Sequence, residues 1–374
     1  MRDETLAMLA DAAAAFAKVD GQRVRRALSH DAGFDRKTWT EMAGQGWLAI
    51  LAPEDRGGLG LGMGASTVVA RQLGRAAYPE PFAAGTAVVA CLSEAEPAAA
   101  WEQRLAMFSA GELLVSLAWQ NVRGDLCPGV TAADDGGHVI LAGESRLVAA
   151  PTADAFLVLA HSGEGQALYW VGRDETGLAI DVETSADGSR SARIRFDAVR
   201  VASNACLIAP ARGAEVMCRA MDVALIVSSA ELLGVMDQAL EMTLEYLRTR
   251  VQFNVPIGSF QALQHRAVDM WIQRQLTEAA LGGAVSVFDN PRASTDERSA
   301  AASGLKARAA QAALFLCNQA LQLHGGIGFA EEYGLGLYLN RAITLSAWLG
   351  NAGRHRRRFG ELYSGAGETA GGAA

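Results

Sequence analysis

Residues 248–265 read RTRVQFNVPIGSFQALQH and join two long helical patterns. Arg250 supplies a forked cation, Gln252 an amide and Phe253 an aromatic face, and the rigid Pro-Ile-Gly turn at 256–258 follows. A guanidinium matches the oxygens of a pyrophosphate, while an amide and a phenyl ring suit a nucleotide base. Taken alone, Arg250 is more simply interpreted as a charge at a helix end. A nucleotide site therefore needs support from elsewhere in the chain.

A second stretch, QLHGGIGF at 322–329, places three glycines at the end of another helical pattern. One glycine there is explained by a helix C-cap. Three glycines flanked by Gln322 and His324 leave a second interpretation open, in which a ligand approaches the backbone closely. A Rossmann fingerprint is excluded, because no strand precedes these glycines, and the same argument makes GGLGLG at 57–62 a loop.

The sequence pattern along the chain changes twice, from helical to strand-like and back. Residues 1–112 are helical in pattern, and residues 113–208 contain short β-branched or aromatic runs separated by Gly, Asp and Ser turns. Residues 209–374 return to helical periodicity. We predict an N-terminal helical domain, a central antiparallel β-barrel and a C-terminal four-helix bundle within these ranges. The bundle helices are expected at 214–249, 261–287, 294–323 (opened by a Ser294/Glu297 capping box) and from about 335.

Composition excludes several classes of protein. The net charge of −8 argues against a nucleic-acid partner, since phosphate binding needs a surplus of Lys and Arg. The longest apolar window, at 223–236, is too short to span a membrane, and the acidic N-terminus does not look like a signal peptide. Five widely spaced cysteines lack metal-ligand spacing. We therefore expect reduced thiols, no metal site and a soluble cytoplasmic protein.

Together these segments resemble the acyl-CoA dehydrogenase family over essentially the whole chain. The stretch at 56–82 looks like the family's N-terminal helical domain, and RIRFDAVRVASNACL at 193–207 is similar to the strand that closes its β domain. The stretches at 250–270 and 321–342 resemble its two most recognisable C-terminal motifs. The resemblance implies a mainly α fold with a β domain, assembled as a dimer or tetramer with FAD at a subunit interface.

The resemblance also assigns residues to the cofactor. In this family the corresponding positions reach the adenine and pyrophosphate half of an FAD bound mainly by the neighbouring subunit. Carried over, the expected FAD contacts are Arg250, Gln252, Phe253, Ile257, Phe260, Gln322, Gly325 and Gly326. A side chain at either glycine would occupy space that the cofactor needs, and backbone amides there can donate hydrogen bonds.

The family's chemistry implies an α,β-dehydrogenation of an acyl-CoA thioester to the trans-2-enoyl thioester. A glutamate takes the proton α to the carbonyl while the β hydrogen leaves as hydride to the flavin. At the two positions where family members carry this glutamate, the present sequence has Leu349 and Ala224, and neither can accept a proton. Glu231, two helical turns beyond Ala224, is a substitute candidate, as are Glu331 and Glu332. The catalytic base is therefore left open.

Two functions remain. In the first, the chain is an FAD-dependent oxidoreductase of fatty acid or steroid side-chain β-oxidation, one subunit of a homo- or heterotetramer, with an electron-transfer flavoprotein as its acceptor. In the second, it is a non-catalytic structural subunit that completes the FAD site of an acid-bearing partner. The β region adds to this choice, because SLAWQNVRGD (116–125) and RLVAAPTAD (146–154) lack the family's usual contacts to the flavin ring.

Overall fold

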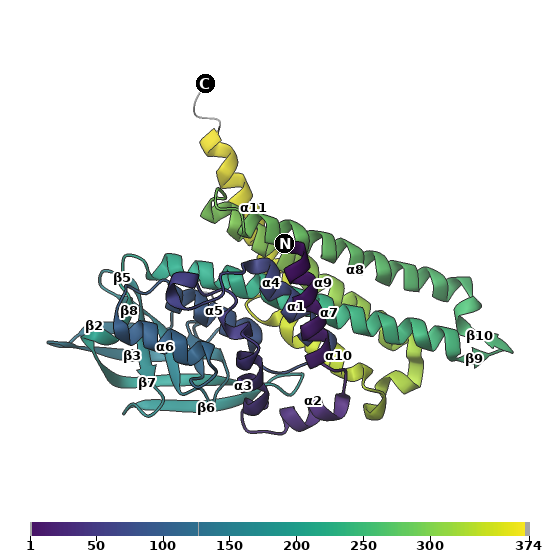
Figure 1. Ribbon diagram of the computed structural model, residues 1–374, viewed down its shortest axis with the longest axis horizontal. Helices are drawn as coiled ribbons and strands as arrows, with labels where there is room; N and C mark the ends of the chain where they lie inside the picture. Colours follow the sequence, from purple (N-terminus) through teal and green to yellow (C-terminus); the bar gives the residue numbers. More distant parts are fainter. Residues whose placement is uncertain (1, 126, 371–374) are drawn as a thin grey trace. The chain divides into compact units, whose positions relative to one another are not determined.

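The computed structural model describes residues 2–125 and 127–370, with side chains from 4 to 363. The chain forms two compact units, each made of separate segments. The first contains residues 1–25, 63–78 and 225–374, and the second contains residues 26–62 and 79–224. Figure 1 shows the predicted order of helices, strands and helices along the chain. The domain boundaries at 112 and 208 stay a prediction.

The first unit is helical. Its elements are α1 (Arg2–Phe16), α4 (Met63–Arg75), most of α7 (Gly213–Thr249), the hairpin β9 (Val251–Gln252) and β10 (Val255–Pro256), α8 (Gln261–Phe288), α9 (Thr295–His324), α10 (Leu335–Ala347) and α11 (Ala352–Ala370). Short 3₁₀ segments lie at Ile257–Ser259 (η4), Gly325–Phe329 (η5) and Glu331–Tyr333 (η6). The four expected bundle helices correspond to α7, α8, α9 and α10, and their bounds lie within a residue or two of those predicted.

Local signals explain these bounds. Ser294 caps α9 through the backbone N–H of Glu297, and the Glu297 side chain accepts from the backbone N–H of Ser294, which completes the predicted capping box. Gly325 ends the same helix with φ 61° and ψ −139°, a conformation that side chains disfavour. Between these ends alanines make up half of the residues that α9 buries, and their small side chains allow close packing against its neighbours.

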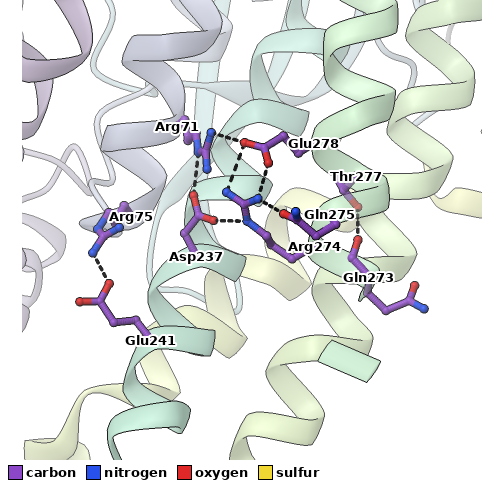
Figure 2. A network of polar contacts seen from close by, with 9 residues as sticks. All are labelled: Arg71, Arg75, Asp237, Glu241, Gln273, Arg274, Gln275, Thr277 and Glu278. Atoms are coloured by element: carbon purple, nitrogen blue, oxygen red, sulfur yellow. Dashed lines mark hydrogen bonds and ion pairs between the residues drawn. The ribbon is translucent and has the colours of Figure 1, made fainter. Parts of the chain in front are cut away.

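An ion network ties α4, α7 and α8 together inside this unit (Figure 2). Asp237 accepts hydrogen bonds from Arg71 Nε at 2.7 Å and from Arg274 Nε at 2.8 Å. Glu278 accepts from Arg71 Nη1 at 2.8 Å and pairs with Arg274. Burial lowers the pKa of Arg71, but the two carboxylates outweigh it, so that the pKa lies above its usual value. Each guanidinium is thus neutralised where it is partly withdrawn from water.

The second unit carries the sheet. Its helices are α3 (Arg36–Gly44), α5 (Phe82–Ser93) and α6 (Ala99–Ser109), and α2 (Gly21–Leu28) begins in the first unit. Its 3₁₀ segments are η1 (Trp47–Ala49), η2 (Glu54–Arg56) and η3 (Ser203–Ala205). The strands are β1 (Val115–Ala118), β2 (Val130–Asp134), β3 (His138–Ala149), β4 (Ala155–Ser162), β5 (Gly165–Gly172), β6 (Leu178–Thr184), β7 (Arg190–Ala202) and β8 (Cys206–Ile208).

The sheet matches the predicted β domain except in its closure. The strand order is β6-β7-β3-β2-β4-β5-β8, with β1 beside β4, and within the described residues no pairing joins β6 to β8. The sheet is therefore not a closed barrel. It is also mixed, because β1 and β2 run parallel to β4 while the other pairs are antiparallel. Tight hairpins force antiparallel pairing, whereas β1 and β2 reach β4 by longer connections that permit either direction.

Two features bear on the environment of the protein. All five cysteines are free, as expected, and Cys91 and Cys317 are buried. None of the helices within the described ranges has the length and hydropathy needed to cross a lipid bilayer.

Candidate functional site

The segment after α7 is a short hairpin that leads into the expected Pro-Ile-Gly turn, where η4 begins at Ile257. Val255 pairs with Gln252 in an antiparallel register, and the Ile257 N–H donates to the Arg250 carbonyl at 2.8 Å. Phe253 and Asn254 form the two-residue loop with φ of 53° and 63°. Asparagine tolerates this left-handed region, but a bulky phenylalanine there is uncommon. The hairpin therefore holds Phe253 outward in a backbone conformation that its own side chain does not favour.

The hairpin presents its side chains to solvent. Phe253 is 87% exposed, and its ring meets Phe260 edge-on with 6.2 Å between centroids. Within the described part of the chain, the exposed Arg250 guanidinium has neither an ion pair nor a hydrogen bond. Gln252 is also exposed, while Ile257 is half-buried. An unpaired fork beside exposed aromatic rings is chemically suited to a phosphate-bearing ligand.

The three positions after α9 differ in the structural reason for having glycine. Gly325 needs the positive φ described above. A Cβ at Gly328 would lie 3.1 Å from both the Cβ of His324 and a methyl of Leu321, so this glycine lets η5 fold back over the helix end. A Cβ at Gly326 would meet no described atom within 4 Å, and its φ is not in the left-handed region. Nothing in the described chain therefore requires glycine at 326.

The ends of α7 and α9 lie side by side. Tyr246, one turn before Arg250, stacks on His324 with 4.6 Å between ring centroids and 23° between planes. His324 immediately precedes Gly325, so the hairpin and the glycine turn belong to one end of the helical unit. Gln322, in the last turn of α9, is exposed there. The expected cofactor residues from both motifs are thus gathered at this end.

Glu231, the substitute candidate for the base, lies in the middle of α7. It is 4% exposed, and its Oε1 accepts from Arg341 Nε at 2.7 Å and pairs with Nη2 at 2.5 Å. The fully buried Lys306 donates to the Leu345 carbonyl. Burial lowers the pKa of Lys306 to about 7, although Glu231 acts in the opposite direction. The carboxylate of Glu231 thus lies in a buried cluster of cations and makes a close ion pair.

None of the other positions considered for the base offers a buried carboxylate. Leu349 is buried with φ 62°, and its carbonyl is 2.9 Å from Nε2 of the buried His355. Ala224 is buried in α7. Glu331 is strongly exposed and pairs with Arg25, and Glu332 is also exposed. Sequence reasoning missed Lys306, His355 and the Tyr246–His324 stack, because each depends on contacts between distant segments.

The donor set at the end of the helical unit fits the phosphate and base portion of a dinucleotide. Arg250 offers an unpaired bidentate donor, and Phe253 offers an aromatic surface. Gly326 leaves its backbone open to close approach. FAD, whose redox chemistry belongs to its ring, would be held here through its non-reacting half.

Comparison with known proteins identifies the family. The acyl-CoA dehydrogenase C-terminal domain model matches residues 211–362 and the N-terminal domain model matches residues 3–101. The acyl-CoA dehydrogenase IpdE2 of Mycobacterium tuberculosis is 30% identical over 321 residues, which are 85% of this chain and 84% of that protein.

Solved structures agree over nearly the whole chain. The Tcur3481-Tcur3483 steroid ACAD variant has a TM-score of 0.88 at 30% identity and covers 98% of this chain and 100% of its own. The ChsE4-ChsE5 complex from Mycobacterium tuberculosis has a TM-score of 0.86 at 26% identity, covering 96% and 97%. This chain therefore belongs to the acyl-CoA dehydrogenase family of FAD-dependent oxidoreductases, which dehydrogenate acyl-CoA thioesters.

Proposed function

We propose that this chain is one subunit of an oligomeric acyl-CoA dehydrogenase and that its helical end completes an FAD site shared with a neighbouring subunit. Bound FAD supplies the hydride acceptor of the reaction. The residues assigned to its adenine and pyrophosphate half are Arg250, Gln252, Phe253, Ile257, Phe260, Gln322, Gly325 and Gly326. The observation that carries the proposal is the unpaired Arg250 beside exposed aromatic rings and the open backbone of Gly326.

Each of these groups has a physical task in that site. Arg250 would neutralise the negative charge of the pyrophosphate with its guanidinium. Phe253 and Phe260 would offer aromatic surface to the adenine and lose their own exposure to water on binding. The backbone N–H groups around Gly326 would be able to donate to the ligand, because no side chain stands in the way. Phe329 in η5, 76% exposed in the single chain, extends the apolar surface that a neighbouring subunit would cover.

An apolar stripe on α8 supports the oligomer. Val268, Trp271 and Leu276 recur at helical spacing on one face, and each is about half exposed in the single chain, Trp271 being 51% exposed. A large rigid aromatic within such a stripe is typical of a subunit contact. Two of the similar solved structures are named as pairs of chains. We propose that a second copy or a related chain covers this face, within a dimer or tetramer.

The base is proposed to come from a partner subunit. Leu349 and Ala224 cannot accept a proton, and Glu231 is held by Arg341 inside the helical unit. These observations also favour a second candidate function, in which the chain is a non-catalytic subunit of an acid-bearing partner. In both cases the substrate is an acyl-CoA thioester. The steroid name of one relative and the apolar Leu349 favour a bulky, ring-bearing acyl group over a short chain.

The electron acceptor and the compartment complete the proposal. As in the family, we propose that an electron-transfer flavoprotein reoxidises the flavin. The cytoplasm is proposed as the compartment, in agreement with five free cysteines.

Flavin content and flavin bleaching test the proposed function. The chain is purified alone and after co-expression with an acid-bearing relative, and both samples are scanned for visible flavin absorbance before and after anaerobic addition of acyl-CoA. A yellow protein that acyl-CoA bleaches only in the co-expressed assembly supports a partner's base. Bleaching of the chain alone would contradict it, and loss of that bleaching in Glu231→Gln would then assign the base to Glu231. An assembly without flavin in either sample would overturn the FAD assignment.

A further inference from the structure

Three aromatic side chains join the hairpin end of α7 to the glycine turn after α9. Tyr246 lies in the last turn of α7, His324 is the last residue of α9, and Tyr333 ends η6. The His324 ring lies 4.6 Å from that of Tyr246 and 5.0 Å from that of Tyr333, centroid to centroid. Tyr333 meets Tyr246 edge-on at 6.4 Å, so that the three rings form one cluster. Such pairs contribute beyond the area that they bury.

Hydrogen bonds fix the orientation of the central ring. His324 Nδ1 lies 2.7 Å from the Ala320 carbonyl and Nε2 lies 3.0 Å from the Tyr333 hydroxyl. A carbonyl only accepts, so Nδ1 carries the proton, and the neutral ring accepts at Nε2 from the Tyr333 hydroxyl. Burial lowers the pKa of His324 against the opposing effect of the carbonyls of Ala320 and Met242. The ring is therefore neutral, with one tautomer and one orientation.

The position of this cluster matters because the groups beyond it are exposed. The hairpin at 251–256 and most of η5 face solvent and have little packing of their own. By contrast, His324 is 3% exposed and is directly bonded to Gly325, while Gly328 folds back onto the Cβ of His324. Tyr246 lies one turn before Arg250, whose N–H donates to the Tyr246 carbonyl at 2.9 Å. Movement of the Tyr246 ring or of the His324 ring would therefore shift the hairpin relative to the glycine turn.

We propose that Tyr246, His324 and Tyr333 are positioning residues for FAD: they set the spacing between Arg250 and the backbone at Gly325-Gly326. They act through the two turns and not by direct contact with the cofactor. This inference rests on the assignment of Arg250 and Gly326 to FAD in the proposed function. It adds a requirement that the assignment alone lacks, namely that the buried His324 ring and the two half-buried tyrosine rings against it control FAD affinity without touching the cofactor.

The test measures FAD affinity of the flavin-bearing assembly after removal and titration of FAD, by quenching of FAD fluorescence. Tyr246→Leu removes the stacked ring and is expected to weaken FAD binding roughly three- to tenfold. Tyr246→Phe keeps the aromatic ring, so FAD affinity should stay within about twofold of wild type. Tyr333→Phe removes only the donor to Nε2 and should weaken binding roughly threefold.

Two readouts separate positioning from general stability. Phe359→Leu disrupts a comparable stack in α11, where Phe359 and Tyr363 are 5.5 Å apart at 22°, and FAD affinity should not change. Nitrogen NMR shifts of His324 should report a protonated Nδ1 in wild type and an altered Nε2 in Tyr333→Phe. An equal loss of affinity in Phe359→Leu would overturn the inference.

The outcomes distinguish this inference from the proposed function. If Arg250→Ala weakens FAD binding while Tyr246→Leu and Tyr333→Phe leave it unchanged, the positioning role is wrong and the FAD assignment stands. If none of these variants changes FAD affinity, the FAD assignment itself is wrong. If Tyr246→Leu does not fold, Tyr333→Phe decides, and unchanged affinity in that variant overturns the positioning role.

Discussion

The pairing of arginine side chains differs between the interior of the helical unit and the end of α7. In the interior, Arg71 and Arg274 share Asp237 and Glu278, and Arg341 pairs with Glu231. At the end of α7, Arg250 has no partner within the described residues and lies beside exposed aromatic rings. A guanidinium withdrawn from water must be neutralised by a carboxylate of the chain, because burying an unpaired charge is costly. An exposed guanidinium is hydrated and can remain unpaired until a ligand binds. The difference separates charges that hold the fold from a charge that is available for binding.

The largest expected effect comes from opening the interior network at Asp237. Asp237→Ala leaves Arg71 and Arg274 partly buried and short of a carboxylate, and should lower the free energy of unfolding by about 4 kcal/mol. Chemical denaturation measures this loss. Glu241→Ala is the matched control, because its pair with Arg75 is exposed and should cost about 1 kcal/mol or less. Equal losses of unfolding free energy would mean that burial does not distinguish the Asp237 network from the Arg75–Glu241 pair, both shown in Figure 2.

The buried cluster around His355 gives a pH-dependent test of the interior. Burial lowers the pKa of His355 to about 4, assisted by Lys306 of α9 and by Arg358 and Arg354 of α11, while the hydrogen bond to Leu349 opposes the shift. In the unfolded chain His355 has the ordinary pKa of about 6.5, so between pH 6.5 and 4 the unfolded chain binds a proton at His355 that the folded chain does not bind. This contribution to stability is therefore complete above pH 6.5 and decreases as the pH falls towards 4, by about 3 kcal/mol in total.

His355→Gln isolates that contribution. The variant keeps a side-chain amide to donate towards the Leu349 carbonyl but does not titrate, so the stability advantage of wild type should shrink between pH 6.5 and 4. Lys306, whose pKa burial lowers to about 7, is mostly protonated within this window. Denaturation curves at several pH values measure the difference. Parallel stability profiles would contradict a neutral buried His355.

The sequence predicted the parts of this fold that local patterns determine. The 3.6-residue periodicity and the Ser294/Glu297 capping box placed the bundle helices within a residue or two of α7 to α10. The alternating runs at 113–208 predicted the strands of the β domain. The parallel pairing of β1 with β4 was not predictable in this way, because it depends on long connections and not on a turn signal.

The candidate site was predictable as a set of residues but not as a geometry. The two motifs pointed to Arg250 and the glycines, yet only the structure separates Gly326, which the chain does not require, from Gly325 and Gly328. Lys306 gave no signal, since lysines usually extend their amines to water. The pair Glu231 and Arg341 joins distant helices and leaves no local pattern. These gaps share one cause, namely that contacts between distant segments are not encoded in a short window.

At the exposed end, Gly326→Val gives the next largest expected effect. A Cβ at 326 meets no described atom within 4 Å, so the fold should tolerate the substitution, but the side chain would occupy the volume assigned to FAD. We expect FAD affinity to fall on the order of 100-fold, the equivalent of about 2.7 kcal/mol. Gly283→Ala in α8 is the control, because its Cβ also meets open space, and this helix position lies outside the assigned site. Full FAD affinity in Gly326→Val would remove the cofactor explanation for this glycine.

Arg250→Ala should have the smallest effect of these variants, roughly a tenfold loss of FAD affinity, because the exposed guanidinium is partly hydrated in the free protein. Arg248→Ala is the matched control: Arg248 is also exposed, lies in the last turn of α7 and has the same charge. If Arg250 binds pyrophosphate through its fork, Arg250→Lys should recover only part of the affinity and Arg248→Ala should lose little. If the helix end acts merely as a positive region, the two alanine variants should lose FAD equally, and Arg250 would then be one surface charge among several.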